Sequence, residues 1–174
     1  MADFPGKVST QTSSQEPQRS YGIPASVDMD FIKGIPGILL VAEIVFGLLV
    51  WALIASTSYS NASAYVWVMF VSVSLWLLSI ALLVVLLLRF HQSLPIIPWP
   101  LVLMVFYSVA TVLYLTAFLA DAASVPNYGF YRGHLGASAF FAIVVSLLYT
   151  ASSYFAYLDW RGEGQNAAGS TVPV

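Results

Sequence analysis

The sequence contains no cysteine, so disulfides, thiolate metal sites, S-palmitoylation and cysteine nucleophiles are excluded. Charge is also scarce, because only 8% of the 174 residues are Asp, Glu, Lys or Arg. The six Lys and Arg residues are scattered along a chain whose net charge is −2. They form no basic patch, and nucleic acid is therefore not an expected partner.

Apolar residues are abundant instead: they make up 59% of the chain, and the mean hydropathy is +0.84. A soluble domain of this length has too little interior to bury so much apolar surface. Four apolar segments are long enough to cross a hydrocarbon core of about 30 Å as helices. Because their connections are short, we expect an all-α membrane protein with an antiparallel four-helix bundle. The predicted spans are residues 35–56, 65–88, 99–120 and 136–158.

The cations predict the orientation of this bundle. Five of the six lie on the side of the two termini, and cytoplasmic loops are enriched in Lys and Arg. We therefore expect both termini to be cytoplasmic. The five are Lys7, Arg19, Lys33, Arg89 and Arg161, and Arg132 alone lies on the other side.

The two ends of the chain are polar. Residues 1–34 are rich in Ser, Thr, Gln and Pro, which predicts a disordered cytoplasmic tail, and residues 159–174 form a second, shorter one. A cluster of hydroxyls in the first tail suggests a phosphorylation switch, although disordered tails are often Ser-rich without regulation. The cluster consists of Ser9, Thr10, Thr12, Ser13 and Ser14.

Glu43 is the one acid inside a predicted span, about 12 Å below the start of the first helix. No cation lies inside the spans to pair with it, so desolvation favours the neutral carboxyl. Such a group can hydrogen-bond a neighbouring helix and hold the bundle together. The alternative is a small oligomeric cation channel or transporter, for which one acid and scattered hydroxyls are thin support. The hydroxyls in question are Ser72, Ser79, Ser108 and Thr111.

Small residues recur at intervals of four along the last span, which places them on one helix face. Backbones approach closely over such a face, and hydroxyls can bond across it. We expect the face to pack within the bundle, with a homo-oligomer surface as the alternative. Its members are Ser138, Ala142, Ser146 and Thr150.

The remaining polar groups give little support for an enzyme or a metal site. His91 and His134 fall on opposite sides of the membrane, about 30 Å apart. No catalytic constellation shares one depth, so we expect no enzyme, no metal and no cofactor. Asn61 begins a glycosylation sequon in the turn after the first span, and we expect it to stay unmodified because it lies so close to the bilayer.

Several short runs of the sequence are similar to a known family of membrane proteins, and composition alone does not reveal this similarity. With four spans, short loops and two tails, the chain resembles the MARVEL-domain family of tetraspan proteins, in the group of MAL and plasmolipin. A generic apolar helix would not reproduce the Trp, Pro and Tyr placements in these runs. They are FPGKVST (4–10), GLLVWALIAS (47–56), VWVMFV (66–71), PWPLVLMVF (98–106), ATVLYLTAF (110–118) and WRGEGQNAA (160–168).

The resemblance implies a non-enzymatic role in membranes rich in cholesterol and sphingolipid. It implies vesicle trafficking, apical sorting and myelin-type membrane organisation, with residence in the plasma membrane and in endosomal and Golgi membranes. The implied partners are these lipids and sorting or trafficking proteins that bind the cytoplasmic tails. Further copies of the chain are a partner only on the alternative reading of the small-residue face.

Overall fold

The computed structural model describes residues 29–93, 96–126 and 129–169, and within these ranges it contains helices and connections but no strand. Four helices are long and apolar enough to cross a membrane. They are α2 (Ile35–Ala55), α3 (Ser63–Leu87), α5 (Trp99–Ser124) and α6 (Arg132–Gly169). Three shorter elements are α1 (Met29–Lys33), η1 (Tyr59–Asn61) and α4 (Phe90–Ser93).

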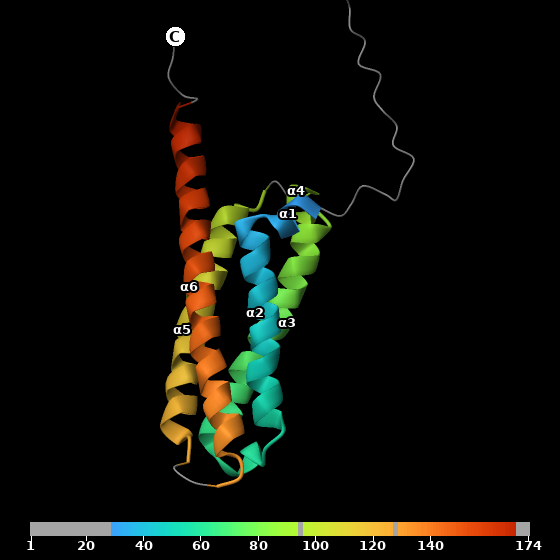
Figure 1. Cartoon of the computed structure of the whole chain (residues 1–174). Helices are drawn as coiled ribbons and strands as arrows, with labels where there is room; N and C mark the ends of the chain where they lie inside the picture. Colours follow the sequence, from blue (N-terminus) through green and yellow to red (C-terminus); the bar gives the residue numbers. More distant parts are fainter. Residues whose placement is uncertain (1–28, 94–95, 127–128, 170–174) are drawn as a thin grey trace, which may run out of the picture.

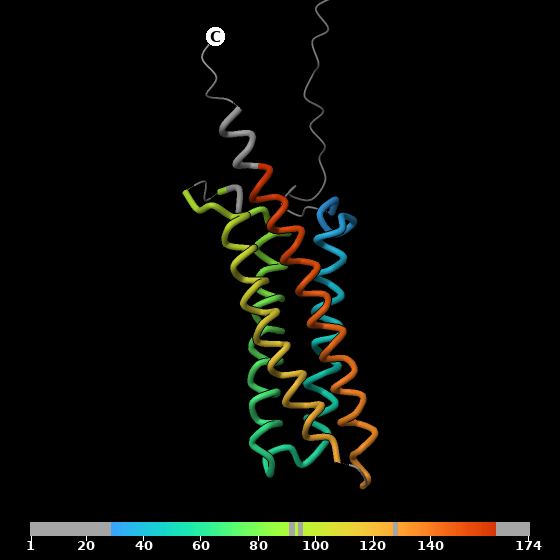
Figure 2. The backbone as a smooth tube through the Cα atoms, turned by 90° about the vertical axis from the view of Figure 1, so that its left-hand side faces the viewer, coloured from blue at the N-terminus to red at the C-terminus, as the bar shows by residue number. Residues whose placement is uncertain are grey.

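The four long helices lie side by side and alternate in direction (Figure 1). We call the end where α2 begins and α6 ends the terminal end, and α1 and α4 lie there as well. The opposite end, the loop end, carries the α2–α3 and α5–α6 connections (Figure 2). The predicted all-α antiparallel bundle of four membrane-spanning helices is confirmed.

Two helices extend beyond their predicted ends. The third runs on from residue 120 to Ser124, because no Pro or Gly interrupts it before Pro126. Proline disfavours helical geometry in the residue before it, and Val125 is extended, with ψ of 120°. The last helix starts at Arg132 and continues to Gly169, so the predicted tail of residues 159–174 is helical over most of its length.

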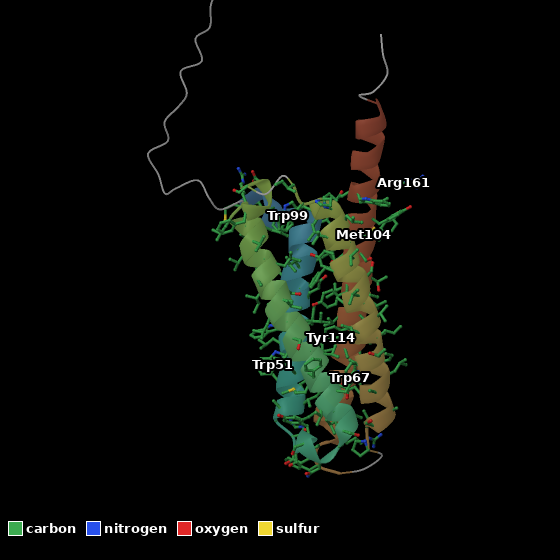
Figure 3. All side chains as sticks on the ribbon, turned by 180° about the vertical axis from the view of Figure 1, so that it is seen from behind. Trp51, Trp67, Trp99, Met104, Tyr114 and Arg161 are labelled. Carbon is green, nitrogen blue, oxygen red and sulfur yellow. The ribbon has the colours of Figure 1, made fainter. Side chains whose placement is uncertain are left out.

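Each long helix buries a seam of residues spaced alternately three and four apart, the spacing that keeps one face turned toward neighbouring helices. On α5 the fully or almost fully buried members are Tyr107, Ala110, Tyr114, Ala117 and Asp121. Large apolar side chains cover the outer faces, as lipid contact requires. Figure 3 shows Tyr114 between the helices, with Trp99 and Arg161 at the terminal end.

The junction of α1 and α2 depends on a missing side chain. Gly34 separates the two helices, and Pro36 occupies the first turn of α2, where its missing N–H has no cost. A Cβ atom at Gly37 would lie 2.1 Å from the carbonyl oxygen of Phe31. The backbone of α1 therefore folds back onto α2 at a distance that only glycine permits.

Gly37→Ala is accordingly expected to displace α1 and to lower the free energy of unfolding by about 1–3 kcal/mol, the usual cost of overpacking. Gly47→Ala in the same helix is the matched control, because its Cβ would lie 3.4 Å from the nearest atom, an ordinary contact. Unfolding of the purified proteins in detergent measures both. Equal stabilities for the two variants would show that α1 does not dock as described.

Candidate functional site

Glu43 lies inside the bundle, with only 1% of its surface exposed. Its seam position on α2 turns it toward α6, where the Ser152 hydroxyl donates a hydrogen bond to Glu43 Oε1 at 2.5 Å. The second carboxyl oxygen, Oε2, is buried and has no hydrogen-bond partner among the described residues. The expected role of Glu43 in helix packing thus has a defined partner, Ser152, and the second carboxyl oxygen of Glu43 is an acceptor without a donor among the described residues.

One turn further along α2, large side chains of two other helices lie close to Gly47. The Tyr114 hydroxyl and the Trp76 ring would lie 3.4 and 3.6 Å from a Cβ placed there. The Trp76 indole N–H donates to the Ile44 carbonyl at 3.0 Å, which joins α3 to α2. A backbone carbonyl that accepts a side-chain donor in this way fixes the relative depth of two helices in lipid.

Three tyrosines continue this buried polar region. The hydroxyls of Tyr149 and Ser79 are hydrogen-bonded at 2.8 Å, which joins α6 to α3. The Tyr149 ring lies 5.4 Å from that of Tyr114 and 6.3 Å from that of Tyr107, both on α5. Sequence analysis did not single these tyrosines out. The signal was available, because Tyr107 and Tyr114 are seven residues apart, as seam positions are.

A second buried acid corrects the sequence analysis. The predicted third span, residues 99–120, leaves Asp121 outside it, and this is wrong: Asp121 lies in α5 and is fully buried. The Ser138 hydroxyl of α6 donates to Asp121 Oδ2 at 2.8 Å, and the Val50 carbonyl of α2 lies 3.3 Å from the same hydroxyl. Glu43 is therefore not the one acid inside the described bundle, and this second polar contact ties three helices together near the loop end.

The predicted small-residue face of α6 divides in two. Ser138, Ala142 and Ser146 are buried, whereas Thr150 is exposed and bonds the Ser146 carbonyl of its own helix at 2.8 Å. The reason is geometric: four residues rotate a helix by about 400°, so a strict interval of four drifts around the axis. Tyr149 takes the seam position instead.

The hydroxyls proposed to line a channel with Glu43 do not gather around one path. Ser72 and Ser79 on α3 are buried, but Ser108 on α5 is exposed and bonds the Ser153 hydroxyl at 2.8 Å. Thr111, also on α5, bonds the carbonyl of Tyr107 in its own helix. The five residues are thus distributed between the interior and the outer face of α5.

The other predicted sites lie apart from this interior. The phosphorylation cluster at residues 9–14 falls outside the described residues. His91 belongs to α4 at the terminal end, and His134 is exposed near the start of α6 at the loop end. Among the described residues, no three His, Cys, Asp or Glu side chains come together as metal ligands.

Comparison of the chain with known proteins shows its family. The profile of the MARVEL family, described as a membrane-associating domain, matches residues 31–155, which contain most of the four spans. The chain belongs to the MARVEL family. It is 78% identical to zebrafish plasmolipin over all 174 residues, with both chains fully covered. It is 47% identical to human plasmolipin, with 99% of this chain and 97% of that protein covered.

A more distant relative shares the MARVEL domain. The human CKLF-like MARVEL transmembrane domain-containing protein 8 is 41% identical over 138 residues, which cover 77% of this chain and 79% of that protein. No solved structure matches the chain. Together with the four apolar helices, these relatives identify an integral multi-pass membrane protein, a tetraspan of the MAL group.

Asn61 is exposed in η1, two residues before α3 begins. We expect its sequon to stay unmodified, because an acceptor so close to a span lies too near the bilayer for the glycosyltransferase. Electrophoretic mobility of protein from mammalian cells, before and after glycosidase treatment, measures this. A mobility shift would mean that the loop end stands further from the membrane than the helices indicate.

Proposed function

We propose that this MARVEL protein is a non-enzymatic organiser of membranes rich in cholesterol and sphingolipid, and that it supports vesicle trafficking, apical sorting and myelin-type membrane organisation. The observation that carries the proposal is the full-length similarity to plasmolipins, which includes both polar ends of the chain. The proposed partners are these lipids, sorting proteins that bind the ends, and further copies of the chain.

The physical character of the bundle supports this role. Three pairs of its buried polar side chains bond to one another between helices, and its outer faces are largely apolar. Ile38, Phe70, Val112 and Leu147 are each more than half exposed and belong to different helices. A rigid bundle with apolar surface on every helix is solvated by lipid all round, and its long spans favour thick bilayers.

Partition between liquid phases tests the lipid part of the proposal. Fluorescently tagged protein in vesicles shed from the plasma membrane should concentrate in the ordered phase, and cholesterol extraction should abolish this preference. A single-span protein with a shorter apolar helix serves as the control. Exclusion of the tetraspan from the ordered phase would contradict the proposal.

Ion flux separates this function from the channel alternative. Liposomes that contain the purified protein should hold a potassium gradient as long as empty liposomes do, because the predicted channel residues point both inward and outward. A flux that depends on protein concentration, and that disappears in Glu43→Gln, would overturn the organiser proposal in favour of a channel.

Orientation is part of the proposal, since sorting proteins must reach the terminal end from the cytoplasm. Three described cations, Lys33, Arg89 and Arg161, belong to that end, and Arg132 begins α6 at the loop end. The cysteine-free chain allows a direct test with an impermeant thiol reagent on intact cells. Ser60→Cys and Phe130→Cys at the loop end should react, and Ser93→Cys at the terminal end should react only after permeabilisation. The reverse pattern would invert the topology.

A further inference from the structure

A cavity of about 340 Å³ opens into the terminal end of the bundle, between α1, α2, α3, α5 and α6. On α6 its wall includes Ser152, Phe155 and Asp159, which share one helix face because they are three and four residues apart. On α5 it extends from Trp99 to Tyr107. The cavity therefore reaches about two helical turns, roughly 10 Å, into the bundle. Its volume falls within the range of small-molecule sites, about 300–1,000 Å³.

Apolar and aromatic groups make up most of the wall. Phe31 and Leu86 contribute from α1 and α3, and Leu103 lies between Trp99 and Tyr107 on α5. The middle of the cavity suits an alkyl chain, which gains free energy when it leaves water, and the aromatic faces at its outer end attract cations.

One of the polar side chains that line the cavity is an acid, and the others, which include the Trp99 indole and the Tyr107 hydroxyl, are neutral. Asp159 lies at the outer end and is exposed, and the Ser152 hydroxyl at the inner end is bonded to Glu43, whose Oε2 has no partner among the described residues. None of the described residues that line the cavity is Lys, Arg or His. Lys33 and Arg161 are exposed and two residues from Phe31 and Asp159, which turns them about 200° away on their helices.

We propose that this cavity binds a single-chain amphiphile that carries an ammonium group, such as a long-chain amine. The ammonium group pairs with the Asp159 carboxylate beside the rings of Trp99 and Phe155, and the alkyl chain extends inward past Leu103 toward Tyr107. An anionic head would face the same carboxylate and be repelled, and a neutral head would gain neither the ion pair nor the cation–π contact. This ligand site is independent of the proposed membrane-organising function.

Photolabelling of the full-length protein in phosphatidylcholine nanodiscs tests the proposal. The probe is dodecylamine with a diazirine on its chain, and dodecanol and dodecyl sulfate with the same diazirine are the matched probes for partition into lipid. Mass spectrometry should find the amine probe on peptides that contain residues 99–107 and 152–159. The yield of labelled peptide should be at least about fivefold higher than with either control probe, because a contact of about 1 kcal/mol raises binding by that factor. Unlabelled dodecylamine should compete.

Variants connect the label to the cavity. Asp159→Asn should lower amine labelling about fivefold, and Asp30→Asn, which removes an exposed acid of α1 that does not line the cavity, should leave it unchanged. Ala156→Phe should remove the label by filling the space. If that variant does not fold, the exposed Asp159 still decides the outcome. Equal labelling by the three probes, or full labelling of Asp159→Asn, would overturn the proposal.

Discussion

Ala142→Leu is expected to prevent the protein from reaching the cell surface, whereas Thr150→Leu, eight residues along the same predicted face, should leave delivery unchanged. Ala142 is fully buried in the seam of α6, and Thr150 is exposed on its outer side. The pair makes the same kind of change, from a small side chain to leucine, in one helix. The added atoms meet protein in one case and lipid in the other, and Thr150→Leu also removes the hydroxyl that bonds the Ser146 carbonyl of its own helix.

The size of the effect follows from how closely the helices approach. α6 packs against α5 and α2, and Ser138, Ala142 and Ser146 are buried on it. Overpacking a soluble core costs about 1–3 kcal/mol and occasionally more. In lipid, close contact between small residues replaces the hydrophobic force that holds soluble helices together, so its loss removes a main source of stability.

An impermeant thiol reagent measures delivery when each protein also carries Phe130→Cys at the loop end, because the natural chain has no cysteine. Gel filtration in detergent measures folding. Ala142→Ser keeps the side chain small and should behave like the natural protein, which separates volume from chemistry. Normal delivery of Ala142→Leu would mean that this part of α6 faces lipid. Failure of Thr150→Leu together with Ala142→Leu would mean that the predicted interval of four, and not the observed seam, describes the packing.

Sequence reasoning found the spans because apolar length is a local property. It found Glu43 for the same reason, since one charge interrupts an otherwise apolar stretch. It could not name Ser152 as the partner, because the two residues are 109 positions apart and their contact depends on how α2 and α6 are rotated. Hydropathy carries no information about rotation when a helix is apolar on every side.

Asp121 and Thr150 show where a finer pattern would have helped. Asp121 continues the spacing of three and four that runs through Tyr114 and Ala117, so the seam predicts it to be buried even though hydropathy ends the span before it. Thr150 fits an interval of four but not the seam. Alternating intervals of three and four therefore locate the buried face better than any single repeated interval.

Glu43→Lys is expected to abolish folding, whereas Glu43→Gln should be nearly neutral. The natural carboxyl accepts the Ser152 hydroxyl through Oε1, and glutamine keeps an oxygen in that position. Its amide nitrogen replaces Oε2, which has no partner among the described residues, so the substitution breaks no described hydrogen bond. Lysine replaces the acceptor with an ammonium group that can only donate, deep in the bundle and beside no ionised acid.

The two substitutions therefore differ in charge at one buried position. A charged side chain at the centre of a membrane helix costs about 2.5–3.5 kcal/mol on insertion scales, and the loss of the acceptor for the Ser152 hydroxyl adds to this. We expect Glu43→Lys to aggregate in detergent and to be retained inside the cell. Glu43→Gln should elute as the natural protein does and show the same preference for ordered membrane.

Ser152→Ala completes the test, because it removes the donor and leaves the carboxyl in place. If the contact joins α2 to α6, Ser152→Ala should destabilise the natural protein. In a protein that already carries Glu43→Leu, no buried carboxyl remains to accept the hydroxyl, so Ser152→Ala should have almost no effect on stability. Unfolding in detergent of the four proteins in this cycle gives the coupling, about 1 kcal/mol for a hydrogen bond between membrane helices. A coupling of zero, or a folded Glu43→Lys, would show that Glu43 does not hold these helices together.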